Sequence, residues 1–235
     1  MRKYIFILLF VPFFSFSQTQ ECATVLTQSQ IDYLTQTRSA RENWNGPEMI
    51  ISLPVQHHIV RETNGTGGLD PNDIPIIMGI MNTYYANANI SFFDCGTINY
   101  IDNSSYYNFD QSQESAVCGA NDVANVINIY YFNSVGNGSS SYCGYAYFPG
   151  GPDRIIMNNA CALNGSTLTH ELGHYLSLYH THQGSTGSNP ELVNGSNCTT
   201  AGDQLCDTPA DPTLSNSTVN TSCVYTGTAT DPNGQ

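Results

Sequence analysis

Histidine is scarce in this chain of 235 residues, and four of its six histidines lie within the segment HELGHYLSLYHTH (170–182). Residues four positions apart share one face of a helix, so His170 and His174 can direct both imidazoles to one point. Glu171 lies about 100° further round the helix, where its carboxylate reaches beside that point without occupying it. Zinc prefers such nitrogen ligands in a tetrahedral arrangement. The spacing therefore predicts a helix that carries a metal site.

A third candidate ligand, His180, can reach the same metal only if the helix ends first. It lies six residues after His174, which on a continuing helix would turn it about 240° away. A sharp turn after Leu176 would bring it back, and such turns commonly use a left-handed residue, usually glycine. The residue here is Ser177, for which that conformation costs on the order of 1 kcal/mol. His182 is the alternative third ligand.

The histidine segment and the later segment GDQLCDTP (202–209) together resemble the pappalysin branch of the metzincin zinc peptidases, whose pattern is HExxHxxGxxH followed by GDxxxDTP. The resemblance implies that His170, His174 and His180 bind zinc (Zn²⁺) and that Glu171 is the general base. Three protein nitrogens leave a fourth zinc position for water, which Glu171 would deprotonate for attack on a peptide carbonyl. The expected function is that of a zinc-dependent metalloendopeptidase acting on protein or peptide substrates.

Two features depart from the family pattern. Ser177 stands where the family usually has glycine, and no methionine follows Met157, so the methionine-containing turn expected beneath the zinc is absent. We therefore expect a fragment that ends before that turn. Two alternatives stay open: a zinc-retaining binding or adhesion module that has lost catalysis, and a metzincin of another family. The family spacing also favours His180 over His182 as the third ligand.

The first 17 residues, MRKYIFILLFVPFFSFS, join a basic start to a short apolar run and a small-residue end, which is typical of a secretory signal peptide. No later stretch is apolar over the roughly 18 residues that a membrane span needs. The formal net charge is −13, which disfavours nucleic acid and anionic membranes as partners. We expect a secreted protein whose eight cysteines form disulfides outside the cytoplasm.

The predicted organisation is a signal peptide (1–17), an N-terminal extension or pro-segment (18–45) and a catalytic domain (46–235) whose C-terminal part is incomplete. A helix should follow Asp70 or Asp73, and Ser166 or Thr167 should cap the histidine-bearing helix. Stretches rich in β-branched and aromatic residues predict strands at 49–60, 90–101, 125–135, 143–150 and 153–160.

This order of elements predicts an α+β fold. We expect a metzincin-like twisted mixed sheet with a backing helix and an active-site helix, followed by a loop-rich C-terminal part that carries disulfides. The strand before the zinc segment, CGYAYFPG (143–150), is expected to be edge-like and to bind substrate by strand addition. His57 and His58 are neighbours on one strand, so at most one should face the interior, and both are interpreted as structural.

Two further sites are predicted with their alternatives open. The thiolate of Cys22 can occupy the open zinc position and keep a proenzyme inactive until cleavage near Arg38 or Arg41, or Cys22 can join a disulfide. The family resemblance raises calcium (Ca²⁺) binding around Asp203 and Asp207, with solvated loop carboxylates as the alternative. Asp211 continues the same four-residue spacing, and Cys198, Cys206 and Cys223 are expected to staple this loop.

Overall fold

The computed structural model of the chain describes residues 20–42, 49–214, 217–222 and 224–235, so the signal-peptide prediction and Cys223 lie outside the described residues. The α-helices are α1 (Gln28–Glu42), α2 (Ile74–Tyr85), α3 (Ser104–Tyr107), α4 (Glu114–Val117) and α5 (Thr167–Tyr175). The strands are β1 (Gln20–Cys22), β2 (Ile51–Arg61), β3 (Ile90–Asp94), β4 (Asn99–Asp102), β5 (Asn108–Asp110), β6 (Ile127–Phe132), β7 (Ser134–Gly136), β8 (Ser141–Ala146) and β9 (Arg154–Asn158).

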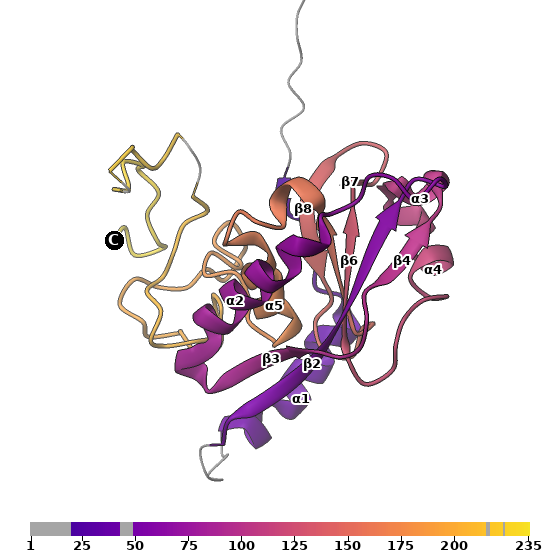
Figure 1. Cartoon of the computed structure of the whole chain (residues 1–235). Helices are drawn as coiled ribbons and strands as arrows, with labels where there is room; N and C mark the ends of the chain where they lie inside the picture. The colour runs from indigo at the N-terminus through magenta and orange to yellow at the C-terminus, as the bar shows by residue number, and fades with distance from the viewer. Residues whose placement is uncertain (1–19, 43–48, 215–216, 223) are drawn as a thin grey trace, which may run out of the picture.

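A nine-stranded mixed sheet organises the fold. Its main path is β3-β2-β6-β9-β8-β7-β5, with β4 paired to β2 and β1 paired to β8. Strand β8 runs antiparallel to β7 and β9, and the other pairings are parallel. Helices α2 and α5 lie together on one face of this sheet (Figure 1). The sheet, its backing helix α2 and the histidine-bearing helix α5 confirm the predicted α+β class.

Both faces of the sheet bury apolar side chains. Alternate residues of a strand point to opposite faces, and in β6 Ile129 packs in the core under α2 and α5, whereas Tyr130 packs in the core beside α4. Because both faces of β2 are covered, His57 and His58 are both buried, at 3% and 0% exposure. The prediction that at most one of them faces the interior is therefore wrong.

Both histidines of β2 make hydrogen bonds in these cores. The ring of His57 lies 3.1 Å from the Tyr131 hydroxyl and 3.1 Å from Oδ1 of Asp94. The ring of His58 stacks on Tyr130, and its Nε2 lies 2.9 Å from Oδ1 of Asn128. Their partners are residues of the sheet, which agrees with the structural interpretation.

Two of the predicted strands are each divided into two. Residues 90–101 form β3 and β4, which both pair with β2. The turn between them contains Gly96, whose φ of 98° favours glycine. Residues 125–135 likewise form β6 and β7. Helix α2 follows a short 3₁₀ turn (Pro71–Asp73) in which the Asp70 side chain accepts a hydrogen bond from the backbone N–H of Asn72, so Asp70 is the capping residue.

The N-terminal extension packs on the sheet. Strand β1 pairs with β8, with Cys22 opposite Gly144, and α1 buries Leu34 and Gln30. The side chain of Gln30 donates a hydrogen bond to the carbonyl oxygen of Phe148. Strand β8 is therefore not an edge: β1 lies along the side expected to be open. The sequence indicated neither β1 nor α1, because the extension is polar and only isolated side chains become buried. The domain boundary at residue 45 stays a prediction.

After α5 the described chain contains only loops, turns and one isolated bridge, Val219 with Tyr225. A disulfide between Cys198 and Cys206 closes part of this region, as expected for a stapled loop. The second disulfide, Cys143 with Cys161, lies in the body of the fold. None of the described helices has both the length and the apolar character needed to cross a membrane.

Candidate metal centre

Helix α5 begins through an asparagine cap that differs from the predicted cap. Oδ1 of Asn164 accepts hydrogen bonds from the backbone N–H groups of Thr167 and Ser166, at 2.9 and 3.1 Å. The side chain of Ser166, at the N-cap position, makes no capping hydrogen bond. The prediction that Ser166 or Thr167 caps the helix is therefore wrong, because the amide of Asn164 satisfies the exposed donors first.

The end of α5 confirms the predicted turn at Ser177, which has a φ of 84°. The backbone N–H of Leu178 bonds to the carbonyl of Gly173, and that of Ser177 bonds to the carbonyl of His174. This pair of bonds is a Schellman motif. The Leu178 side chain lies over Gly173, which adds the apolar contact that commonly accompanies the motif. The helix therefore ends early enough for the chain to turn back and bring His180 beside His170 and His174.

Replacing Ser177 by glycine is expected to stabilise the protein by about 1 kcal/mol. A non-glycine residue in the left-handed region costs about 1–2 kcal/mol, and the added freedom of glycine in the unfolded chain offsets part of that gain. Urea unfolding of the two proteins measures the difference. Ser188, which does not have a positive φ, provides the matched control: Ser188→Gly should destabilise slightly. Equal shifts for the two variants would contradict the strain at Ser177.

The structure brings the three predicted histidine ligands together. Their Nε2 atoms are 3.0 Å apart for His170 and His174, 3.1 Å for His174 and His180, and 3.2 Å for His170 and His180. Tetrahedral zinc with Zn–N bonds of about 2.0–2.1 Å would hold two such nitrogens about 3.3 Å apart. Three imidazole nitrogens whose lone pairs face one another at these distances repel unless a cation lies between them. The donor set therefore fits zinc.

The hydrogen bonding and packing of His174 set its orientation. Its Nδ1 lies 2.8 Å from the carbonyl oxygen of Leu178, which assigns the proton to Nδ1 and leaves Nε2 to face the cluster. The ring also packs on Phe148, with 5.2 Å between centroids. Burial, together with the neighbouring imidazoles of His180 and His170, lowers the pKa of His174 to about 4. Burial likewise lowers the pKa of His180 to about 4, so both rings are neutral near pH 7, as metal ligands must be.

His182 lies beside this cluster but outside the group of converging ligand atoms. Its ring stacks on that of His180, with 4.8 Å between centroids. It also lines a cavity of 410 Å³ together with Ser166, Leu214 and others. The arrangement thus agrees with the family spacing, which favours His180.

Glu171 is fully buried beside the histidines. Its Oε1 has no hydrogen-bond partner, whereas Oε2 lies 2.8 Å from the hydroxyl of Thr24. Burial raises the pKa of Glu171 to about 7. A side chain on Gly144 of β8 would meet the backbone oxygen of Ile156 and the sulfur of Met157 at 2.8 Å, and Cγ of Glu171 at 3.5 Å. Glycine at this position therefore allows the helix to lie close against the sheet.

Cys22 reaches the site from the extension. Its sulfur lies 3.5 Å from Nε2 of His174 and 3.6 Å from Oε2 of Glu171, and it joins the three histidines in one group whose ligand atoms lie within 4.8 Å of one another. Burial, together with the charge of Glu171, raises the pKa of the thiol to about 12. Of the two alternatives open from sequence, this position favours a thiol at the metal site.

The acidic loop residues do not gather as the sequence spacing suggested. Asp203 is buried and accepts hydrogen bonds from the backbone N–H of Leu205 and the hydroxyl of Thr208, but Asp207 is exposed. The described residues contain no group of three or more histidine, cysteine or carboxylate ligands at this loop. Calcium binding around Asp203 and Asp207 stays a prediction.

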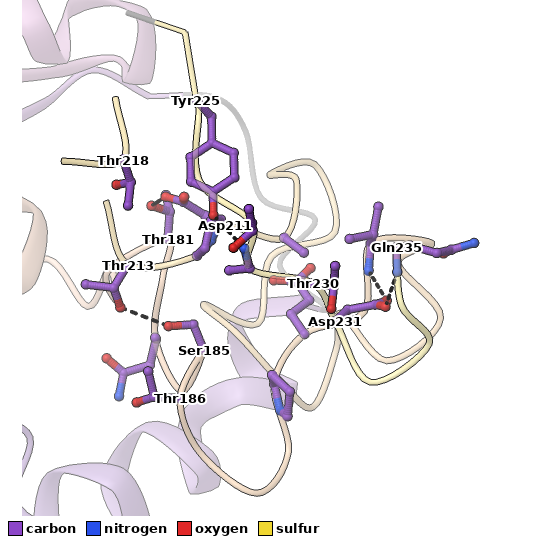
Figure 2. A pocket seen from close by; sticks show the side chains of 18 residues that line it. Thr181, Ser185, Thr186, Asp211, Thr213, Thr218, Tyr225, Thr230, Asp231 and Gln235 are labelled. Carbon is purple, nitrogen blue, oxygen red and sulfur yellow. Dashed lines mark hydrogen bonds between the residues drawn. The ribbon is translucent and has the colours of Figure 1, made fainter. Parts of the chain in front are cut away.

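The C-terminal segment instead folds over the loop that follows His180. Figure 2 shows Asp211 beside Thr181, whose hydroxyl donates a hydrogen bond to the Asp211 carboxylate. It also shows the hydrogen bond between the hydroxyls of Ser185 and Thr213. These residues line a pocket of 340 Å³. Glu191 also lines it, yet is buried at 7% exposure, and its Oε2 has no hydrogen-bond partner. Sequence reasoning missed Glu191 because no motif surrounds it.

Comparison with known proteins places the chain in a family. Residues 110–230 match the family model described as pregnancy-associated plasma protein-A. An extracellular metalloprotease of Colletotrichum graminicola is 27% identical over 179 residues, which cover 68% of this chain and 58% of that protein. An extracellular metalloprotease of Podospora anserina is 28% identical over 189 residues, covering 70% and 58%. Metalloproteinase-II from Bacteroides fragilis aligns with a TM-score of 0.32 and 13% identity, over 74% of this chain and 52% of that one.

The class indicated by the helix-borne histidines and the family match is that of the metallopeptidases. Because the match covers more than half of its residues, the chain belongs to the pregnancy-associated plasma protein-A family of peptidases. This confirms the resemblance to the pappalysins that the two motifs indicated. A metal ion is thus expected at the site. The chain spans 58% of the length of the curated relatives that it matches.

Proposed function

We propose that this chain carries the active site of a secreted zinc-dependent metalloendopeptidase, in which His170, His174 and His180 bind zinc and Glu171 is the general base. The observation that carries the proposal is the convergence of three Nε2 atoms within 3.2 Å of one another beside a fully buried glutamate. The names of the relatives, extracellular metalloproteases, support secretion and peptide hydrolysis.

The chemistry is divided between the metal and Glu171. Zinc bound at the histidines would supply a Lewis acid that polarises a peptide carbonyl and lowers the pKa of water. Glu171 takes the proton of the attacking water and passes it to the leaving amine. With the extension in place, burial raises the pKa of Glu171 to about 7. A carboxylate that shifts in this direction is suited to general acid–base work near neutral pH only where the bound substrate keeps it buried.

Strand β8 provides the surface on which an extended peptide can pair once the extension has left. Its backbone groups at Gly144 and Ala146 bond to the extension in the described state, and release of the extension would free them for substrate by strand addition. Digestion of a peptide library by the protein freed of its extension, with and without a zinc chelator, tests the proposed activity. Cleavage that the chelator does not affect would contradict it.

The position of the extension is consistent with a latent form of the protein, in which the Cys22 thiol occupies the open zinc position. We expect Cys22→Ala to raise the activity of the uncleaved full-length protein, because loss of the thiol opens the fourth zinc position to water. Activity against a fluorogenic peptide, measured together with thiol titration, gives the result. Cys95 is half-buried and outside the site, so Cys95→Ala is the control. Latency unchanged in Cys22→Ala would contradict the switch.

A further inference from the structure

The extension contacts Glu171 through a second residue, Thr24, as well as through Cys22. The Thr24 hydroxyl oxygen lies 2.8 Å from Oε2 of Glu171 and 2.8 Å from the backbone nitrogen of Ala146. It also lies 3.2 Å from the carbonyl oxygen of Ala146. One side chain from the extension therefore touches both the carboxylate on α5 and the backbone of β8.

The course of the extension explains why this contact forms through a side chain. The ladder between β1 and β8 ends with the bond from the backbone N–H of Ala23 to the carbonyl of Gly144. The next β8 group that faces the extension is the Ala146 N–H, and the Thr24 hydroxyl accepts its hydrogen bond. A hydroxyl has a single proton to donate. Glu171 is the nearer acceptor and a charged carboxylate makes the stronger hydrogen bond, so the proton is directed to Glu171.

We propose that Thr24 is a second latency contact, which caps the general base while Cys22 blocks the metal. The inference rests on the proposed function and deepens it. The hydroxyl donates to the carboxylate oxygen that would otherwise accept a proton from water, and it uses the Ala146 N–H on which a substrate strand would pair. Removing the thiol from the metal therefore frees only one of the two catalytic components.

A packing role for Thr24 would leave a different signature from a hydrogen-bonding role. Valine has nearly the shape of threonine but no hydroxyl, whereas serine keeps the hydroxyl and loses the methyl group. If Thr24 only fills space, Thr24→Val will resemble the wild type and Thr24→Ser will not. If the hydroxyl caps Glu171, the order reverses. The two substitutions thus form a matched pair.

The activity test uses uncleaved full-length protein in the Cys22→Ala background. Adding Thr24→Val should raise peptide hydrolysis roughly tenfold, because a hydrogen bond to a charged group is lost, and adding Thr24→Ser should change it little. After removal of the extension, all variants should have wild-type kcat/KM, since residue 24 has left. Equal activity of the valine and serine variants before cleavage would overturn the proposal.

A second readout does not depend on zinc or on catalysis. Hydrogen exchange at the Ala146 amide should accelerate roughly tenfold in Thr24→Val, the factor expected for loss of about one net hydrogen bond, and not in Thr24→Ser. The Ala23 amide, bonded to Gly144, is the internal control. Equal exchange at Ala146 in both variants means that Thr24 is not the cap. Exchange that follows the prediction in a protein that never cleaves peptides would instead reject the peptidase function and keep the contact.

Discussion

Replacing Glu171 by glutamine in the enzyme freed of its extension is expected to lower kcat/KM for peptide hydrolysis by roughly 10²–10⁴-fold, the contribution typical of a general acid–base group. Glutamine keeps the shape of the side chain but cannot accept the proton of water. The three histidine Nε2 atoms do not depend on this carboxylate, so the zinc content should stay unchanged. Rates on a fluorogenic peptide and metal analysis of the same samples measure both quantities.

Glu62 provides a control for the Glu171 substitution, because it lies just after β2 and is not part of the group formed by Cys22 and the three histidines. Glu62→Gln should retain wild-type rates. If Glu171→Gln and the wild type cut at equal rates, the proposed mechanism is wrong. If both bind zinc and neither cuts any peptide of a library, the alternative of a zinc-retaining binding or adhesion module is favoured instead.

The second large effect is expected at the third ligand. His180→Ala should weaken zinc binding by more than the roughly 10–100-fold that loss of an outer-shell partner costs, because it removes one of three protein donors. His182→Ala should cost no more than that outer-shell range of roughly 10–100-fold, since its ring stacks on a ligand and is not itself a donor. Competition with a chromogenic chelator measures both affinities.

The same pair of variants decides between the two histidines. His180 lies within the group of converging donors, whereas His182 lies beside it. Should His182→Ala release zinc and His180→Ala retain it, the ligand assignment would be reversed. Loss of zinc in both variants would mean that the turn after α5, rather than one particular ring, holds the third donor in place. Circular dichroism of both variants, recorded with and without zinc, separates loss of the fold from loss of a ligand.

The features of the site that could be predicted from the sequence are those set by residues close to one another along the chain. The helical spacing of His170 and His174 and the need for a left-handed turn before His180 follow from a dozen consecutive residues, and the structure has that turn at Ser177. The five stretches predicted as strands do contain strands, because β-branched and aromatic runs mark them, whereas the three-residue strands β1 and β5 were not predicted. The exact bounds could not be predicted from these runs, because the division of 90–101 depends on how β3 and β4 each pair with β2.

What could not be predicted depends on contacts between distant segments. Cys22 and Thr24 reach Glu171 across 149 and 147 positions, and no local pattern specifies such a pairing. The burial of both His57 and His58 had the same origin: only the assembled sheet shows that both faces of β2 are covered. A threonine in a polar extension has no distinguishing signal until the structure places it beside a buried carboxylate.

The disulfide between Cys143 and Cys161 joins β8, the strand beside Glu171, to the short turn (Asn159–Cys161) that precedes α5. One covalent bond thus fixes the spacing between the proposed substrate strand and the helix that carries the base. Disulfides form in oxidising compartments, whereas cysteine thiols are kept reduced in the cytosol. If the chain is secreted as proposed, this bond forms only after export, so the strand and the helix are held at a fixed spacing only outside the reducing cytosol.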